Sequence, residues 1–504
     1  MSGRFIAQVA GLGMAVLLLA PSTAAAQACE ALRDHALAGG TITGVTAVEA
    51  GQFRTPEGGR GGGQLLQGAP GFCRVEALLT PVPGSEIRIE VWMPQAGWNR
   101  RLVALGNGGF AGAIGYAGLS EAVAAGYAAA STDTGHTGGN PSFTLEEAAL
   151  VDFAHRAIHE MTVAAKSIIE ARYASAPEFS YFNGCSTGGR QALTAAQRYP
   201  ADFDAIVAGA AANNTVRMTT QQLWTGRAVA ADPSAALSEE NLGSLHRGVL
   251  AACDADDGVM DGVIENPQAC RFDASSVSSL NNAQGAAVQA IYRGAVNTLS
   301  GQAIFPGLAR GSELGWAAMA SGDPFGYANS IHAFVINRNP DWNWRTLDFG
   351  RDLTPVDARV NSVGMQAVDP DLRPFLSRGG KLLMYHGWND PLISPFNSVS
   401  YYTAAVHTVG GDVAQDSIRL FMMPGVDHCD GGIGTDTWDK LEAIDAWRTT
   451  GEAPGRVDAS HLTDGRVDRT RPLCAYPEIA VYRGVGDTND AASFECGLPP
   501  LPTP

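Results

Sequence analysis

The sequence predicts an α/β protein with a mainly parallel sheet and a large insertion in the middle of the chain. Short apolar runs alternate with helical patterns from about residue 85 to 210, and the alternation returns after about residue 370. Such alternation is typical of parallel strands that are joined by helices on both faces of a sheet. The stretch between is irregular and rich in Gly, Asn, Trp and Asp, so we expect it to lie outside the sheet.

The individual elements follow from local pattern. Residues 87–93 alternate with period two, which is typical of a strand. The other predicted strands cover residues 101–105, 127–131, 179–182, 203–208, 381–386 and 418–423, and the helices cover 146–173, 189–198 and 435–449. We therefore expect a catalytic domain made of residues 29–212 and 370–504, and a lid domain made of residues 213–369.

Composition and the N-terminus limit the class of protein. The chain has 504 residues and a net charge of −17, and 45% of its residues are hydrophobic. A folded protein without a basic stripe is not expected to bind nucleic acid. A signal peptide over residues 1–28 is predicted by Arg4, by an apolar run over 6–20 and by small residues near Ala26. The apolar run is too short to span a bilayer. We expect a secreted or periplasmic protein with no membrane span; the oligomeric state is not predicted.

One serine stands in the pattern of an activated nucleophile. Gly184, Ser186 and Gly188 form G-x-S-x-G between a predicted strand and a predicted helix. In α/β hydrolases this motif holds the serine on a strained turn, which requires small residues two positions to either side. The N-terminus of the following helix favours developing negative charge. We therefore predict an α/β-hydrolase fold with Ser186 as nucleophile, the alternative being a structural Gly-Ser turn.

A serine hydroxyl needs a base, and in this fold the acid and then the histidine follow the serine along the chain. Asp390 and His428 each come just after a predicted strand of the second block. The carboxyl ends of strands are where open α/β sheets build their sites. We predict Asp390 as the acid and His428 as the base. Asp427 is a rival acid, and His386 is a rival base.

The eight cysteines indicate disulfides, because the chain is expected to be exported and contains no C-x-x-C pair. Sequence alone does not settle the pairing. Short separations along the chain favour the pairs Cys29–Cys73, Cys253–Cys270 and Cys474–Cys496. The two remaining cysteines, Cys185 and Cys429, would then pair with each other. Since the last two adjoin Ser186 and His428, a bond between them would tie nucleophile to base across the whole lid.

The order Cys-Ser, then Asp, then His-Cys resembles the tannase and feruloyl esterase family, which includes terephthalate mono-ester hydrolases. The resemblance covers nearly the whole mature chain and includes Gly106 to Phe110 and Gly184 to Arg190. It implies a Cys185–Cys429 disulfide beside the Ser186, Asp390 and His428 triad. It also implies an oxyanion hole formed by the backbone N–H groups of Gly109 and Thr187, which suits the chemistry of acyl transfer.

An acidic loop at residues 253–264 places four aspartates within eight positions. The negative charges of these aspartates repel one another, and a bound hard cation would relieve that repulsion. The alternative is an acidic turn exposed to solvent. No Glu closes a twelve-residue loop, so the loop is not a standard EF-hand. The family resemblance implies a structural Ca²⁺ in the lid, bound by these residues: Asp254, Asp257 and Asp261 by side chain, and Val259 and Val263 by carbonyl.

The resemblance implies a small aromatic ester as substrate, of feruloyl, galloyl or terephthaloyl type. Aromatic lid residues could wall its pocket, although core packing is the more common fate of any single one. An arginine should meet a free carboxylate on the acyl group. The candidates are Trp316, Phe334, Trp342 and Trp344 for the wall, and Arg310, Arg338 and Arg345 for the carboxylate. A serine peptidase or amidase on the same fold, or a non-catalytic binding protein, is the alternative function.

Overall fold

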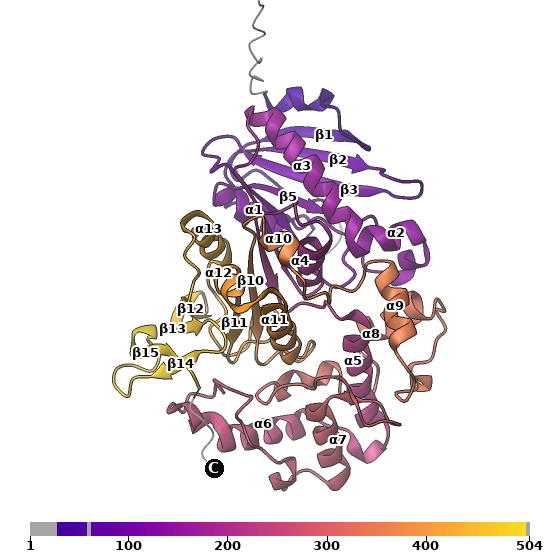
Figure 1. The fold of residues 1–504 in the computed structure, drawn as a ribbon, viewed down its shortest axis with the longest axis vertical. Coiled ribbons are helices and arrows are strands. Elements are labelled where there is room, and N and C mark those ends of the chain that lie inside the picture. The colour runs from indigo at the N-terminus through magenta and orange to yellow at the C-terminus, as the bar shows by residue number, and fades with distance from the viewer. Residues whose placement is uncertain (1–27, 58–61, 500–504) are drawn as a thin grey trace, which may run out of the picture.

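A nine-stranded sheet forms the centre of the computed structural model, which describes residues 28–57 and 62–499 (Figure 1). The strand order is β1-β2-β3-β5-β4-β6-β7-β10-β11, and all neighbours from β5 to β11 run parallel. Strands β1, β2, β3 and β5 pair antiparallel. The bounds are β1 (Gly40–Val48), β2 (Phe72–Leu79), β3 (Ile87–Pro94), β4 (Arg101–Leu105), β5 (Ala128–Thr132), β6 (Phe179–Cys185), β7 (Ala205–Gly209), β10 (Lys381–Gly387) and β11 (Ile418–Met423). The predicted mainly parallel sheet is confirmed, whereas the predicted signal peptide lies outside the described residues, apart from its last residue.

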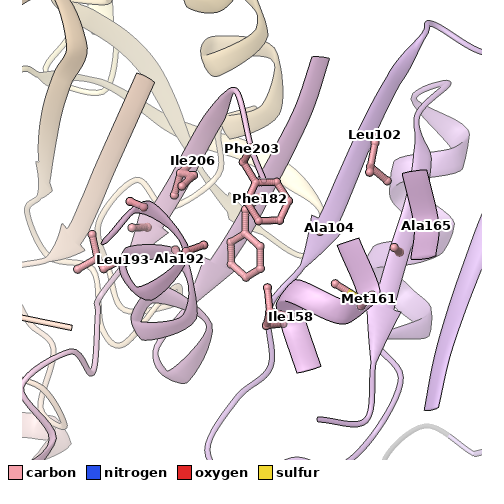
Figure 2. Packing of buried hydrophobic residues seen from close by; sticks show 14 of the residues in the cluster. Leu102, Ala104, Ile158, Met161, Ala165, Phe182, Ala192, Leu193, Phe203 and Ile206 are labelled. Atoms are coloured by element: carbon pink, nitrogen blue, oxygen red, sulfur yellow. The ribbon is translucent and has the colours of Figure 1, made fainter. Parts of the chain in front are cut away.

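Helices cover both faces of the sheet because successive strand residues point to opposite sides. Leu102 and Phe182 face one side and pack with Ile158 of α3 and with residues of α4 (Figure 2). Residues of α11 belong to the same apolar cluster. Their chain neighbours Val103 and Tyr181 face the other side and pack against α1 and α13. These helices are α1 (Tyr116–Ala124), α3 (Ala157–Tyr173), α4 (Thr187–Arg198), α11 (Phe396–Val409) and α13 (Lys440–Thr450).

Between β7 and β10 the chain leaves the sheet and forms a helical layer beyond one end of it (lower part of Figure 1). This inserted segment has its own apolar core, in which Leu245 and Ile291 pack around Trp316. Its elements are α5 (Thr215–Ala230), α6 (Glu239–Cys253), α7 (Asn282–Arg293), β8 (Ala295–Val296), β9 (Ala303–Phe305), α8 (Gly326–Ser330) and α9 (Thr354–Ser362). Helix α10 (Arg373–Leu376) follows these elements and packs beside α4 in the core of the sheet. The insertion occurs where the sequence pattern loses its alternation.

Several elements differ from the sequence expectation. The helix expected over 146–173 is divided into α2 (Glu147–Val151) and α3 by a π-helical turn at Asp152–Arg156, where Arg156 pairs with Asp152. The helix expected from residue 435 begins at Lys440, because the Asp439 side chain caps it. Strands β1 and β2, helix α12 and two C-terminal hairpins had no predicted counterpart: α12 (Gly411–Ser417), β12 (Arg456–Thr463), β13 (Arg466–Cys474), β14 (Ile479–Tyr482) and β15 (Phe494–Gly497).

Four disulfides join distant parts of this fold. They are Cys29–Cys73, Cys185–Cys429, Cys253–Cys270 and Cys474–Cys496, which is the pairing favoured from the sequence. Within the described ranges, no helix has both the length and the apolar character needed to cross a membrane.

Candidate active site

Ser186 occupies a sharp turn between β6 and α4, at the carboxyl end of the sheet. Its φ of 63° and ψ of −120° lie in a region that residues with a side chain rarely adopt. The Ser186 N–H donates to the carbonyl of Gly209, and the Ser186 carbonyl accepts from the N–H of Ala212, both at 3.0 Å. A Cβ on Gly184 would stand 2.7 Å from the backbone of Gly188. The turn therefore requires glycine at this motif position because the two backbones touch.

His428 and Asp390 lie on the loops that follow β11 and β10. Nδ1 of His428 is 2.6 Å from Oδ2 of Asp390. The other carboxylate oxygen, Oδ1, accepts the backbone N–H groups of Leu392 and Ile393 at 2.8 Å. The partner of the histidine ring is thus Asp390 and not the adjacent Asp427.

The charges of Asp390 and His428 support each other. Burial raises the pKa of Asp390, but the charge of His428 and the hydrogen bonds from His386 and His428 outweigh it and hold that pKa below its usual range. Burial lowers the pKa of His428, but the charge and hydrogen bond of Asp390 outweigh it and raise that pKa overall. In the neutral ring the proton sits on Nδ1, facing Asp390, so Nε2 is left to accept a proton.

His386, the rival base, is completely buried. Its Nε2 lies 3.0 Å from Oδ2 of Asp390, and its Nδ1 lies 2.7 Å from Oγ of Ser398. Among the described residues that line the cavity beside Ser186, the histidine is His428. His428 is therefore the ring that shares the cavity wall with Ser186.

Ser186 and His428 share the wall of a cavity of about 510 Å³. The cavity lies between the carboxyl end of the sheet and the inserted segment, since both supply its lining. The lining residues are Gly106, Asn107, Gly108, Gly109, Cys185, Ser186, Thr187, Ala212, Met218, Gln222, Phe325, Tyr327, Leu392, Ile393, His428 and Cys429. Within the described residues this lining contains no Arg, Lys, Asp or Glu, so His428 is its one side chain that can carry a charge.

The loop after β4 meets the first turn of α4 beside Ser186. The hydroxyl of Thr187 donates to the carbonyl of Gly109 at 3.1 Å. The Asn107 N–H donates to Oε1 of Gln191 at 3.0 Å, and Nε2 of Gln191 donates to Oδ1 of Asn107 at 3.3 Å. Because N–H groups in the first turn of a helix lack intrahelical acceptors, the Thr187 N–H is available to a ligand. Gly109 and Thr187 both line the cavity, as an oxyanion hole requires.

The Asn107–Gln191 amide pair is a feature that the sequence did not reveal. The two residues are 84 positions apart. Asn107 lies in the Gly106 to Phe110 segment, but nothing in the sequence pairs it with Gln191. The pair ties the glycine loop to α4, the helix that begins just after Ser186, so it links the two elements that supply the candidate oxyanion donors.

The Cys185–Cys429 disulfide lies directly against the site. Its Cα atoms are 6.0 Å apart, and it joins residues separated by 244 positions in the chain. Each cysteine adjoins a candidate catalytic residue, Ser186 on one side and His428 on the other. The bond therefore fixes the two loops relative to each other independently of the inserted segment.

Comparison with known proteins settles the family. The family model described as "Tannase and feruloyl esterase" matches residues 73–497. The chain belongs to this family. An uncharacterized esterase of Xanthomonas campestris pv. campestris is 34% identical, over 96% of this chain and 93% of its own length. A probable feruloyl esterase B-2 of Aspergillus terreus is 33% identical, over 84% and 86%.

A solved structure agrees with this assignment. The crystal structure of feruloyl esterase B from Aspergillus oryzae superposes with a TM-score of 0.84 at 29% identity, and the match covers 93% of this chain and 99% of that one. The predicted α/β-hydrolase fold and the predicted esterase class are confirmed.

In this member of the tannase and feruloyl esterase family, the acidic loop lies at the end of α6 and is braced by Cys253–Cys270. Burial raises the pKa of Asp257 to about 6, and the nearby charge of Asp261 adds to the effect. Burial also raises the pKa of Asp254, again with a contribution from Asp261. Oδ2 of Asp261 pairs with Nη2 of Arg471 at 2.5 Å. The oxygen-only donor set suits a hard cation, although no described group of three or more His, Cys, Asp or Glu is gathered as a metal site.

The arginine candidates lie away from the cavity of this esterase. Arg310 stacks on Tyr292 with its guanidinium carbon 4.8 Å from the ring centroid, and Arg338 donates to the carbonyls of Thr144 and Leu145. Arg345 stacks on Trp344.

The aromatic candidates are also placed elsewhere. Trp316 and Trp344 are buried in the cores of the inserted segment, and the aromatic residues that line the cavity are Phe325 and Tyr327. Neither Phe334 nor Trp342 lines the cavity. The cavity is therefore not walled by the candidates Trp316, Phe334, Trp342 and Trp344, and for Trp316 and Trp344 the alternative of core packing holds. An aromatic residue of the insertion can belong to a core or to a cavity wall, and sequence pattern does not distinguish the two.

Replacing Cys185 and Cys429 by alanine together is expected to impair both stability and catalysis. Loss of a native disulfide costs about 2–5 kcal/mol of unfolding free energy, and loosening the two loops should lower kcat, measured well below the unfolding temperature. The matched control is the double alanine variant of Cys474 and Cys496, a disulfide outside the cavity, which should lower stability but leave kcat unchanged. Equal kcat in the two variants would contradict a role of Cys185–Cys429 in positioning the site.

Proposed function

We propose that this esterase hydrolyses uncharged esters of aromatic acids through an acyl-enzyme on Ser186. The observation that carries the proposal is the shared cavity, in which Ser186 and the Asp390-paired His428 meet the Gly109 and Thr187 backbone within an otherwise uncharged wall. Membership of the tannase and feruloyl esterase family supports the ester class.

The proposed reaction has two steps. Nε2 of His428 takes the hydroxyl proton of Ser186 as Oγ bonds to the ester carbonyl carbon, and the oxyanion is held by the N–H groups of Gly109 and Thr187. The bond to the alcohol then breaks, and His428 returns the proton to the departing oxygen. Water then attacks the acyl-enzyme as the same ring takes its proton. The ring returns that proton to Oγ of Ser186 when the bond to the acyl group breaks and the acid is released. Asp390 keeps the ring oriented and stabilises its charged form.

The uncharged wall favours some acyl groups over others. A feruloyl or galloyl ester brings an uncharged ring, which apolar residues such as Met218, Phe325 and Ile393 can cover. A terephthalate mono-ester brings a carboxylate that would be buried without a partner, at a considerable cost in free energy. We therefore propose neutral feruloyl or galloyl esters as the substrate class.

We also propose that residues 213–369 act as a lid domain over a catalytic domain of residues 29–212 and 370–504. Met218, Gln222, Phe325 and Tyr327 of the inserted segment complete the cavity wall, which supports this division. We propose export from the cytoplasm, guided by residues 1–28. Four disulfides support export, since disulfides are rare in reducing compartments.

In the lid we propose a structural Ca²⁺ held by the side chains of Asp254, Asp257 and Asp261 and the carbonyls of Val259 and Val263. The raised pKa values of Asp254 and Asp257 support this, because carboxylates that are buried, and that also lie near the charge of Asp261, gain from a nearby cation. The ion would brace the loop and takes no part in the proposed reaction.

Ser186→Ala is expected to remove hydrolysis of methyl ferulate and methyl gallate, because the variant has no hydroxyl to form the acyl-enzyme. The expected fall in kcat is at least about 10³-fold, measured by release of the free acid, with an unfolding temperature close to that of wild type. The amide of ferulic acid should be a poor substrate for the wild type. Full activity of the folded Ser186→Ala variant would overturn the mechanism, and equal cleavage of amide and ester would favour the amidase alternative.

Two terephthalate esters test the uncharged wall directly. Bis(2-hydroxyethyl) terephthalate is neutral, whereas the mono-ester has the same ring and scissile bond but bears a carboxylate. We expect kcat/KM for the mono-ester to be lower by at least about tenfold, since an unpaired buried charge costs several kcal/mol. Equal kcat/KM values would show that a cation reaches the acyl group.

Removal of calcium is expected to lower the unfolding temperature, and added CaCl₂ should restore it, because an ion that binds only the folded chain stabilises it. Asp257→Asn should abolish this calcium dependence. Asp256→Asn is the matched control, since Asp256 is an exposed residue of the same loop outside the proposed ligand set, and it should keep the dependence. An unfolding temperature that is the same in chelator and in calcium would remove the ion from the proposal.

A further inference from the structure

A second histidine shares the carboxylate that orients His428. His386, on β10, places Nε2 3.0 Å from Oδ2 of Asp390, the same oxygen that lies 2.6 Å from Nδ1 of His428. Nε2 of His386 is also 3.1 Å from the carbonyl oxygen of Ile393. His386 and Asp390 are both completely buried, so water does not replace these contacts.

The partners of His386 define which ring nitrogen carries the proton. A carboxylate and a backbone carbonyl only accept hydrogen bonds, so Nε2 must donate to Asp390 and Ile393. On the other side of the ring, the Ser398 hydroxyl can donate to Nδ1, which lies 2.7 Å away. Ser398 is itself buried in the first turn of α11, so this tautomer is fixed by the packing of that helix on the sheet.

We propose that His386 is a positioning residue of the catalytic site, which holds Oδ2 of Asp390 toward His428 and takes up part of its negative charge. This rests on the proposed function. Two backbone N–H groups fix Oδ1, and without His386 the other oxygen would have His428 as its one side-chain donor among the described contacts. His386 thus completes four hydrogen bonds to one carboxylate and restricts its rotation.

Sharing Oδ2 has an electrostatic consequence for the base. A carboxylate oxygen that accepts a second hydrogen bond attracts the His428 proton less strongly, so His386 should moderate the basicity of His428. The other charged groups near the ring are Asp430 on its own loop and Asp427, whose carboxyl is influenced by Asp390. Both stay in place when His386 alone is changed, so a shift in the pH profile reports on Asp390.

The test compares His386→Leu with His386→Gln, using methyl ferulate. Leucine removes the donor, and we expect kcat to fall about tenfold, the effect of one lost hydrogen bond, with KM nearly unchanged. The acidic limb of kcat/KM should move to higher pH, because His428 now needs a higher pH to lose its proton. Glutamine can place an N–H near the former Nε2, so it should restore most of kcat and return the limb toward its wild-type position.

His332→Leu is the matched control, because His332 is a buried histidine of the inserted segment that stacks on Trp342. It should lower stability without moving the pH profile. If His386→Leu does not fold, Ser398→Ala is the second test of the positioning role. It removes the hydroxyl that hydrogen-bonds Nδ1 of His386, so the acidic limb of kcat/KM should move to higher pH, by less than in His386→Leu. The positioning role would be overturned if a folded His386→Leu variant had wild-type kcat and a wild-type pH profile. If that variant does not fold, the same result in Ser398→Ala would overturn it.

Failure of this inference is distinguishable from failure of the proposed function. Inactive Ser186→Ala alongside a wild-type-like His386→Leu removes only the positioning role. Full activity in Ser186→Ala, or wild-type protein that cleaves none of the aromatic esters, removes the proposed function itself.

Discussion

The close approach of backbones beneath Ser186 is the constraint on which the site depends. A Cβ on Gly106 would lie 2.7 Å from Cα of Gly188, and one on Gly189 would lie 2.3 Å from the carbonyl oxygen of Gly209. The ends of β4, β6 and β7 can therefore meet the start of α4 only where these positions are glycine. The strained backbone of Ser186 persists because its neighbours leave it no alternative.

The same edge of the sheet stabilises a buried negative charge. Asp390 is fully buried, and a carboxylate without partners would be strongly unfavourable there. Backbone N–H groups and two imidazole rings supply its hydrogen bonds, and each comes from a residue within or next to the loops after β10 and β11. The parallel strand order therefore brings the acid and the base together at the same edge as the serine.

Much of this arrangement could be predicted because it is encoded in short motifs. G-x-S-x-G, the residues after two apolar strands, and the cysteines beside Ser186 and His428 are all visible in the sequence. The antiparallel strands β1 and β2 were not foreseen, although β1 pairs with β2 and β2 pairs with its chain neighbour β3. The pattern of β1 is weakened by Gly40 and Gly44, because glycine is depleted in strands.

The cavity wall was less predictable for a physical reason. Phe325 and Tyr327 line it while Trp316 fills a core, although all three are large aromatic residues of one irregular segment. His386 shows an intermediate case. Its spacing of four residues from Asp390 is readable, but the hydrogen bond between them depends on how the loop turns after β10.

The cavity is built by two parts of the chain that are held in different ways. Ser186 and His428 stand on sheet loops that Cys185–Cys429 joins covalently, whereas Phe325 and Tyr327 come from the insertion. Because the disulfide bypasses the insertion, a change there can reshape the wall without moving the serine relative to the histidine. Under the proposed mechanism, substitution in the insertion would change which acyl group is accepted, while the sheet loops would keep the geometry of the reacting atoms.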